Sequence, residues 1–204
     1  MRIILLLAVL FYSSFNIYSQ QDCVIASYNI LNYPGSTSSI RNPYFRTVIE
    51  NVQPDVLVVQ EILSQAGVDE FLNNVLNVAS SGYAAGTFIN GYDTDNAIFY
   101  KTDKFSFISN IPINTELRDI NEFTLVNIST SDTIRFYSLH LKASSGSTNE
   151  EKRAKEVDSL RKVTNALPPN SSFIILGDFN IYYSNDTFLG STVSRSALTT
   201  SLRK

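Results

Sequence analysis

Polar side chains capable of acid–base or metal chemistry stand at the ends of four apolar runs in the sequence. They are Glu61 after Asp55–Gln60, His140 after Ile134–Leu139, Asp178 and Asn180 after Phe173–Leu176, and Asn29 after Val24–Tyr28. In layered α/β folds, side chains from several strand ends converge at one end of the sheet and form the ligand site. Carboxylate and amide oxygens are hard donors that suit magnesium or manganese. The pattern therefore favours a divalent-cation site.

Each of these residues also has a purely structural interpretation. A carboxylate after a strand is commonly a helix cap or a solvated turn residue, and a single histidine is commonly a satisfied structural side chain. Four strand ends with compatible groups make coincidence less plausible, but their spacing alone names no reaction.

The elements that must position these groups follow from hydrophobic periodicity and turn residues. Helices are expected from Asn42-Pro43 to Pro54, from Gly67 to Asn77, and from Ser147-Thr148 to Pro168-Pro169, with Thr148 and Glu151 as a capping box. Besides the four runs above, strands are expected at Thr87–Asn90, Ala97–Tyr100, Phe105–Ser109 and Phe123–Ile128. Strands with helices between some of them predict sheets covered by helices.

The amino-acid composition excludes several kinds of catalytic and metal site. The chain has 204 residues, a net charge of -3, 44% hydrophobic and 17% charged residues, which is a globular profile and not that of a polybasic nucleic-acid wrapper. Cys23 is the only cysteine and His140 the only histidine, so an intrachain disulfide, a cysteine-based zinc site and a two-imidazole mechanism within this chain are excluded. A phosphate substrate must then be held by local positive charge or by cations.

The N-terminus is typical of an export signal. Met1-Arg2 supplies a positive end, and Ile3–Phe11 is an apolar run too short to span a bilayer, which needs about 20 residues. We expect a signal peptide over residues 1–20, one domain over 21–204, and a periplasmic or extracellular location without stable membrane association after signal removal. A buried first strand is the alternative interpretation of this run.

Five short strings carry a family resemblance. In order along the chain they are SYNI at 27–30, PDVLVVQE at 54–61, DNAIFY at 95–100, SLHLK at 138–142 and LGDFN at 176–180. Together they resemble the endonuclease/exonuclease/phosphatase superfamily, which has the deoxyribonuclease-I-like fold. The resemblance implies an α/β fold, a four-layer sandwich of two mixed, mainly antiparallel sheets with outer helices, and hydrolysis of a phosphoester that depends on Mg²⁺ or Mn²⁺.

The resemblance also assigns roles residue by residue. Glu61 is implied to be the principal metal ligand with Asn29 beside it, while His140 contacts the phosphoryl oxygens. Asp178 is implied to orient or activate the attacking water, and Asn180 to hold the phosphate.

Two weaker assignments concern substrate binding. Arg118 stands where the family has a phosphate-contacting arginine, although a solvated turn residue is an equal alternative. Asn96, in the DNAIFY string, is expected to line the cleft.

The sequence departs from the family pattern after residue 180. No closing Asp-His pair follows, because the chain contains no second histidine. We therefore expect a C-terminally truncated domain with its last strands missing and with impaired catalysis. Two hypotheses remain: an exported phosphoesterase, which could be a nuclease, phosphodiesterase or phosphatase, or a non-catalytic fragment or binding module that keeps the fold. The substrate itself, nucleic acid or a small phosphoester, is left open.

Overall fold

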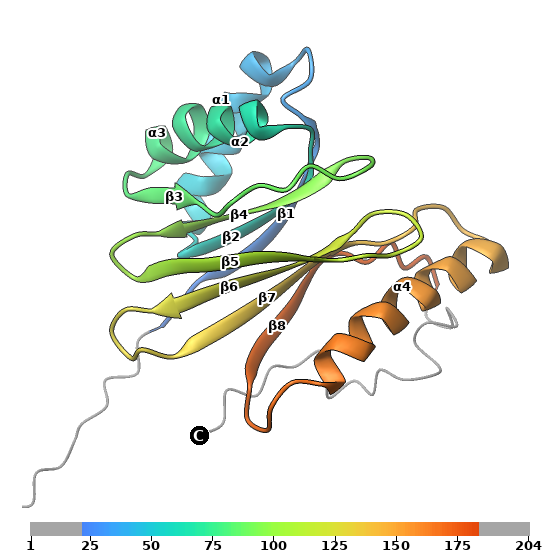
Figure 1. The fold of residues 1–204 in the computed structure, drawn as a ribbon. Helices are drawn as coiled ribbons and strands as arrows, with labels where there is room; N and C mark the ends of the chain where they lie inside the picture. The colour runs from blue at the N-terminus through green and yellow to red at the C-terminus, as the bar shows by residue number, and fades with distance from the viewer. Residues whose placement is uncertain (1–21, 184–204) are drawn as a thin grey trace, which may run out of the picture.

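A computed structural model describes residues 22–183, and these residues form two sheets packed face to face between helices (Figure 1). The expected signal peptide, residues 1–20, and the last part of the expected domain, residues 184–204, lie outside the described residues.

The first sheet carries Asn29 and Glu61. Its strands are β1 (Ile25–Tyr33), β2 (Val56–Ile62), β3 (Tyr83–Ala85) and β4 (Asp95–Lys101), in the order β1-β2-β4-β3. The β1–β2 pair is parallel, whereas β4 runs antiparallel to both β2 and β3. The carboxyl ends of β1 and β2 therefore meet at one end of the sheet.

The second sheet carries His140 and Asp178. Its strands are β5 (Phe105–Ile113), β6 (Ile120–Asn127), β7 (Thr133–His140) and β8 (Ser172–Asp178), in the order β5-β6-β7-β8. Only the β7–β8 pair is parallel. A crossover helix, α4 (Ser147–Asn165), connects these two strands, as parallel pairing requires.

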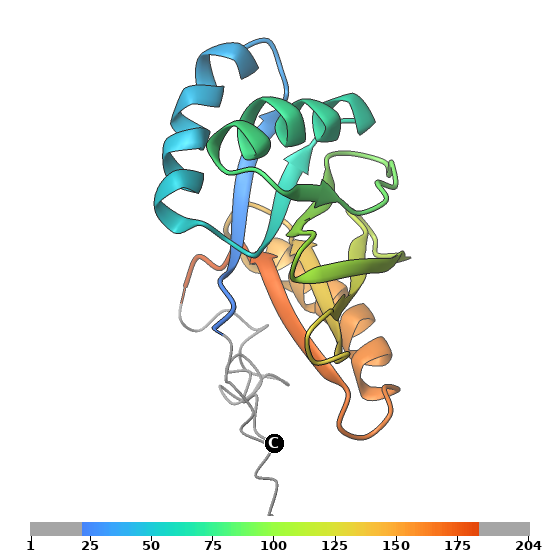
Figure 2. The ribbon, with the colours of Figure 1, turned by 90° about the vertical axis from the view of Figure 1, so that its left-hand side faces the viewer.

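Helices cover the two outer faces. The first sheet is covered by α1 (Ser38–Val52), α2 (Gln65–Phe71), a π-helical turn η1 (Leu72–Leu76) and α3 (Asn77–Ala79), while α4 lies on the far side of the second sheet (Figures 1 and 2). Figure 2 also shows the edge strands β1 and β8 next to each other across the two sheets.

Three apolar clusters separate the four layers. One lies between the first sheet and its helices and includes Phe45, Phe71 and Phe99. The second, between the sheets, is built by Val58, Ile98, Phe105, Phe123, Phe136 and neighbours. The third lies under α4 and includes Tyr137, Leu139 and Leu160. The predicted sandwich of two mixed sheets with outer helices is confirmed.

The predicted start of the first helix and the predicted capping box of the third are wrong. Helix α1 begins at Ser38, not at Asn42-Pro43, because the buried Asn42 side chain accepts a hydrogen bond from the Tyr33 hydroxyl (2.9 Å) and does not cap the helix. Pro43 lies inside the helix. Helix α4 has Gly146 as its N-cap and no side-chain cap bond, so the Thr148–Glu151 capping box is not formed.

The expected strand at Thr87–Asn90 is also wrong. The segment 86–94 is a connection, and the strand lies earlier, at Tyr83–Ala85. Asn77 fixes it there by accepting from the Tyr83 N–H (2.9 Å) and donating to the Tyr83 carbonyl (3.1 Å).

Among residues 22–183, no helix combines the length and apolar character needed to cross a bilayer.

Candidate active site

Glu61 reaches the site through a β-bulge. Gln60 pairs with Asn96 and Ile62 with Asp95, so Glu61 between them has no partner on β4. Its φ of 63° lies in the left-handed region, which is unfavourable for a residue with a side chain. Bulges and strained backbone occur together at sites where a side chain must be redirected, and here the glutamate carboxylate turns toward the second sheet.

The parallel register of β7 and β8 places His140 directly beside Asp178. One position earlier Leu139 pairs with Gly177, whose φ is +136°. A Cβ atom on Gly177 would lie 2.0 Å from the Leu139 carbonyl oxygen. Only glycine permits this approach, so Gly177 is what lets the Asp178 carboxylate stand next to the imidazole.

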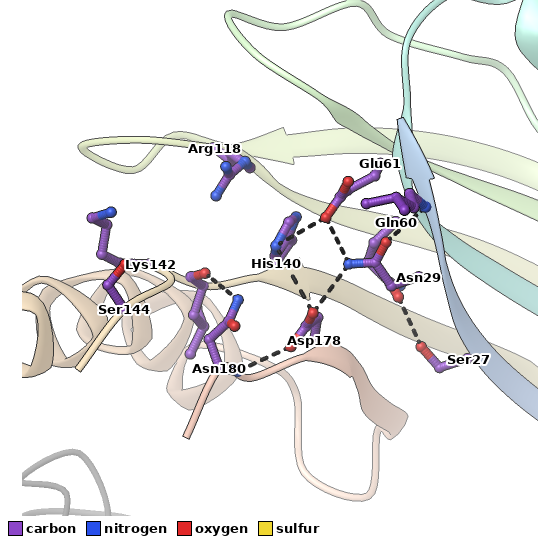
Figure 3. A network of polar contacts seen from close by, with 12 residues as sticks. Ser27, Asn29, Gln60, Glu61, Arg118, His140, Lys142, Ser144, Asp178 and Asn180 are labelled. Atoms are coloured by element: carbon purple, nitrogen blue, oxygen red, sulfur yellow. Dashed lines mark hydrogen bonds and ion pairs between the residues drawn. The ribbon is translucent and has the colours of Figure 1, made fainter. Parts of the chain in front are cut away.

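The Asn29 amide joins the two sheets at the site (Figure 3). Its Nδ2 donates to Glu61 Oε1 (2.8 Å) and to Asp178 Oδ2 (3.1 Å). Its Oδ1 accepts from the Leu31 N–H (3.0 Å). The nitrogen therefore faces the carboxylates, and the metal-ligand role predicted for Asn29 would require its amide to rotate by half a turn.

The irregular end of β1 that follows Asn29 supplies a further donor to Glu61. The Asn32 N–H donates to Glu61 Oε2 (3.1 Å), and both Leu31 and Asn32 have φ of 49°. Arg41 on α1 holds this segment by donating to the carbonyl oxygens of Ile30, Leu31 and Pro34 at 2.8–3.0 Å. Neither Asn32 nor Arg41 was predicted from the sequence, since Asn32 acts through its backbone N–H and Arg41 binds backbone carbonyl oxygens, and such backbone groups leave no residue-type signal.

His140 is almost fully buried between the two carboxylates. Its Nε2 lies 3.8 Å from Glu61 Oε1 and 3.9 Å from Asp178 Oδ2, which is beyond hydrogen-bond length. Its Nδ1 is buried and has no hydrogen-bond partner among residues 22–183. Burial, followed by the charge of Arg118, lowers the pKa of His140 below its ordinary value against the opposing effect of Asp178 and Glu61. The imidazole is therefore neutral near pH 7.

Asn180 fixes the orientation of Asp178. Its backbone N–H donates to Asp178 Oδ1 (3.1 Å), and its side-chain Nδ2 donates to the Leu141 carbonyl (2.9 Å). Asn180 has φ of 48°, a conformation that asparagine tolerates better than most residues. The second N–H of its amide and its Oδ1 make no hydrogen bond within the described chain, which leaves them for a ligand.

Arg118 lies above His140 in Figure 3 and is held in an ion pair. Its Nη2 is 2.9 Å from Asp93 Oδ2, with the arginine side chain 20% and the aspartate side chain 48% exposed. Arg118 is thus near enough to the imidazole to influence its titration, and it is not a freely solvated turn residue.

Asn96 is buried, so the prediction that it lines an open cleft is wrong. It is 2% exposed, and its Nδ2 faces Asn121 Oδ1 (2.9 Å), the Asp119 carbonyl (3.3 Å) and the Ser138 carbonyl (3.5 Å). Gln60 makes a second bridge between the sheets by donating to Ser138 Oγ (3.2 Å). Asn96 therefore links β4 to β6 and β7 through buried hydrogen bonds.

Gln60, Ser138 and Asn121 were not singled out from the sequence. All three are buried, and the available signal was a polar residue inside an otherwise apolar strand. Buried polar groups at such positions are hydrogen-bonded, and here the bonds align the ends of β2, β4, β6 and β7.

The donor set determines what cation the site suits. No group of three or more histidine, cysteine, aspartate or glutamate side chains within residues 22–183 is arranged as a metal cage. Two carboxylates that share one amide and a neutral imidazole instead present uncompensated negative charge on hard oxygens. This is the donor pattern of an open site in which water and substrate complete the coordination.

Most of the chain matches one known protein family. The model of the "Endonuclease/Exonuclease/phosphatase family" matches residues 13–198. The chain belongs to this family. Its members hydrolyse phosphoesters, and the family membership predicted from the five strings is confirmed. No curated protein matches the chain in sequence.

Solved structures agree on the fold. TDP2 from D. rerio, humanised by 14 mutations, has a TM-score of 0.62 at 19% identity over 82% of this chain and 69% of that one. The mannosyl-6-phosphatase of Bacteroides thetaiotaomicron gives 0.59 at 21% identity, over 82% and 69%. ANGEL2, a 2',3'-cyclic phosphatase, gives 0.57 at 21% identity, over 80% and 55%. At these identities the likeness establishes the fold.

Proposed function

We propose that this chain is an exported hydrolase that cleaves a phosphoester bond and depends on Mg²⁺ or Mn²⁺. The observation that carries the proposal is the convergence of Glu61 and Asp178, from different sheets, on one amide and one buried imidazole. The two carboxylates bring negative charge to one amide. A divalent cation held at Glu61 would offset that charge.

Glu61 is the principal residue that would hold this cation, and Asp178 Oδ2 contacts the same Asn29 Nδ2 as the Glu61 carboxylate. When bound, the cation would neutralise charge on the phosphoryl oxygens and lower the pKa of a bound water. Asn29, with its nitrogen between the carboxylates, keeps them apart and aligned.

The chain's own residues supply the remaining chemistry. Asp178 would accept the proton of the attacking water, since its Oδ1 is fixed by the Asn180 N–H and its Oδ2 faces the site. The neutral imidazole of His140 would donate one hydrogen bond to a phosphoryl oxygen, and Arg118 would contribute a fixed positive charge. Negative charge on these oxygens grows during in-line attack.

The substrate class that we propose is a phosphoester. Within residues 22–183, Arg118 is the arginine placed to contact its phosphoryl group. TDP2 from D. rerio has been solved with a single-stranded DNA product, the Bacteroides protein is a mannosyl-6-phosphatase, and ANGEL2 is a cyclic phosphatase. All three of these descriptions involve a phosphate ester or its product, and we propose a phosphoester as the substrate class of this chain.

A turnover assay tests the proposal. Purified chain is given p-nitrophenyl phosphate and bis(p-nitrophenyl) phosphate with MgCl₂ or EDTA, and Glu61→Gln is compared with Glu50→Gln, an exposed glutamate on α1. We expect Mg²⁺-dependent turnover that Glu61→Gln reduces by about 10²-fold or more and Glu50→Gln leaves unchanged. Turnover equal in the wild type and Glu61→Gln would refute the proposal.

A non-catalytic binding module is the second candidate, favoured by the single histidine in 204 residues. It predicts that Mg²⁺ and inorganic phosphate raise the melting temperature of the wild type, and not of Glu61→Gln, while neither substrate is hydrolysed. Ligands that bind only the folded state produce such a shift.

Export has its own test. The apolar run Ile3–Phe11 and its polar flank support cleavage near residue 20. Mass spectrometry of the product released by a secreting host should give a chain that starts near Gln21, whereas a product retained in the cytoplasm with Met1 or Arg2 intact would contradict export.

A further inference from the structure

The ion pair between Arg118 and Asp93 lies at the mouth of the site. Asp93 belongs to the segment 86–94, which leads into β4, and its side chain is 48% exposed. The Arg118 side chain, 20% exposed, lies near His140 (Figure 3). The distance between Nη2 and Oδ2 is 2.9 Å, so the Nη2 amino group is already engaged by a carboxylate.

The backbone of Arg118 is positioned without help from Asp93. Thr115 Oγ1 accepts from the Leu117 N–H (3.1 Å) and donates to the Arg118 carbonyl (2.8 Å), which closes the turn. The next residue is anchored from below, because the Asp119 carbonyl accepts from Asn96 Nδ2 (3.3 Å). The Nε of Arg118 is buried and makes no hydrogen bond within residues 22–183. Loss of the Asp93 carboxylate would therefore leave the backbone of Arg118 in place and release its Nη2 from the ion pair.

We infer that Asp93 is a specificity-determining residue, whose carboxylate competes with the phosphoryl group of the substrate for the guanidinium of Arg118. The inference rests on the proposed function, which makes Arg118 a phosphate contact. An oxygen at 2.9 Å from Nη2 occupies the position that a phosphoryl oxygen would take. A phosphate must either displace the Asp93 carboxylate from Arg118 or bind next to its negative charge.

The competition has a consequence for substrate choice. With Asp93 the pair is neutral, and without it the mouth of the site gains one net positive charge. A dianionic phosphomonoester gains more from that change than a monoanionic phosphodiester. Asp93 thus biases the site toward the less charged ester.

The inference is tested by calorimetric titration with inorganic phosphate at fixed MgCl₂ and low salt. Asp93→Asn is expected to bind phosphate about two- to fivefold more tightly than the wild type, the range for a partly exposed ion pair. Asp132→Asn, which removes an exposed carboxylate at the opposite end of β7, is the matched control and should leave the affinity within error. High salt should shrink the effect of Asp93→Asn.

A double-mutant cycle separates competition from general electrostatics. Arg118→Gln should weaken phosphate binding, and Asp93→Asn should give no gain in that background. Where turnover is measurable, Asp93→Asn should lower the KM for p-nitrophenyl phosphate more than that for bis(p-nitrophenyl) phosphate, with little change in kcat. Asp93→Ser serves as a second variant, and melting curves verify that each variant is folded.

Several results would overturn the inference. They are weaker or unchanged phosphate binding by both Asp93 variants, an equal gain in the Arg118→Gln background, and no phosphate binding by the wild type. The proposed function fails in a different way, through absent turnover while phosphate affinity still responds to Asp93 and Arg118.

Discussion

At the scale of single residues, His140 has an unusual position because it is a buried imidazole between two carboxylates that remains neutral. The attraction of Glu61 and Asp178 for a proton is outweighed by burial and by the charge of Arg118. A neutral imidazole can donate one hydrogen bond and keep the other nitrogen as an acceptor. This suits the hydrogen bond to a phosphoryl oxygen that we propose for His140.

The titration of His140 can be observed directly, since it is the only histidine. In EDTA, we expect the imidazole signals in NMR spectra to titrate with a pKa below 6.5, and Arg118→Gln to move that pKa upward. Arg46→Gln, on α1, is the matched control. A wild-type pKa above 6.5, or one that Arg118→Gln leaves in place, would show that the assignment of these charges is wrong.

The same shift has a consequence for stability. Because the pKa of His140 is lowered in the folded state, the unfolded chain takes up its proton first as the pH falls. The stability contributed by the neutral imidazole is complete above pH 6.5 and is lost as the pH falls from there through the folded-state pKa.

At the scale of elements, the site is built from strand ends, and α4 holds the segment that leaves one of them. Glu156 Oε2 accepts from the Lys142 N–H (2.9 Å), and Arg153 donates to the carbonyls of Lys142 (2.9 Å) and Ser144 (3.0 Å). Both side chains are at least 99% buried. Burial raises the pKa of Glu156, opposed by the Lys142 N–H and nearby positive charges.

Substitution of Glu156 tests whether these bonds from α4 to residues 142–144 stabilise the fold. Glu156→Ala removes the acceptor of the Lys142 N–H and the negative charge near Arg153, so we expect the free energy of unfolding to fall by about 1–3 kcal/mol. Urea denaturation measures the change. Glu151→Ala, exposed on the same helix, should change it by less than about 0.5 kcal/mol, and equal effects of the two substitutions would argue against such stabilisation.

Most elements could be predicted from the sequence because apolar periodicity reflects burial on one face. The start of α1 could not be predicted. Asn42 could cap a helix only if its side chain were free, and here that side chain accepts a hydrogen bond from the Tyr33 hydroxyl. The bulge at Glu61 was equally hidden, because a left-handed glutamate has no composition signal. The family strings singled out the right strand ends, but not the buried amides beneath them or the partner of Arg118.

At the scale of the whole molecule, the inter-sheet core connects the two halves of the site. Glu61 and Asn29 come from the first sheet, and His140 and Asp178 from the second, so their distances depend on how the sheets pack. Phe136 on β7 is fully buried in this core with Val58 and Ile98 opposite. The polar bridge from Gln60 to Ser138 continues the same interface up to the site.

Phe136→Ala should therefore affect stability and the site together. We expect a loss of about 3–5 kcal/mol in the free energy of unfolding, from lost burial and the cavity left behind. Ile108→Ala, at a residue that is 59% exposed, is the control. A Phe136→Ala variant as stable as the control would contradict the packing described.

The most direct test of the account is a kinetic cycle on the two carboxylates. kcat/KM for bis(p-nitrophenyl) phosphate with MgCl₂ is measured for the wild type, Glu61→Gln, Asp178→Asn and the double variant. If both residues serve one reaction centre, each single substitution lowers kcat/KM by about 10²–10⁴-fold, and the double variant is no worse than about the poorer single one. Wild-type rates in either single variant, or no turnover in the wild type beyond that of the double variant, would contradict the account.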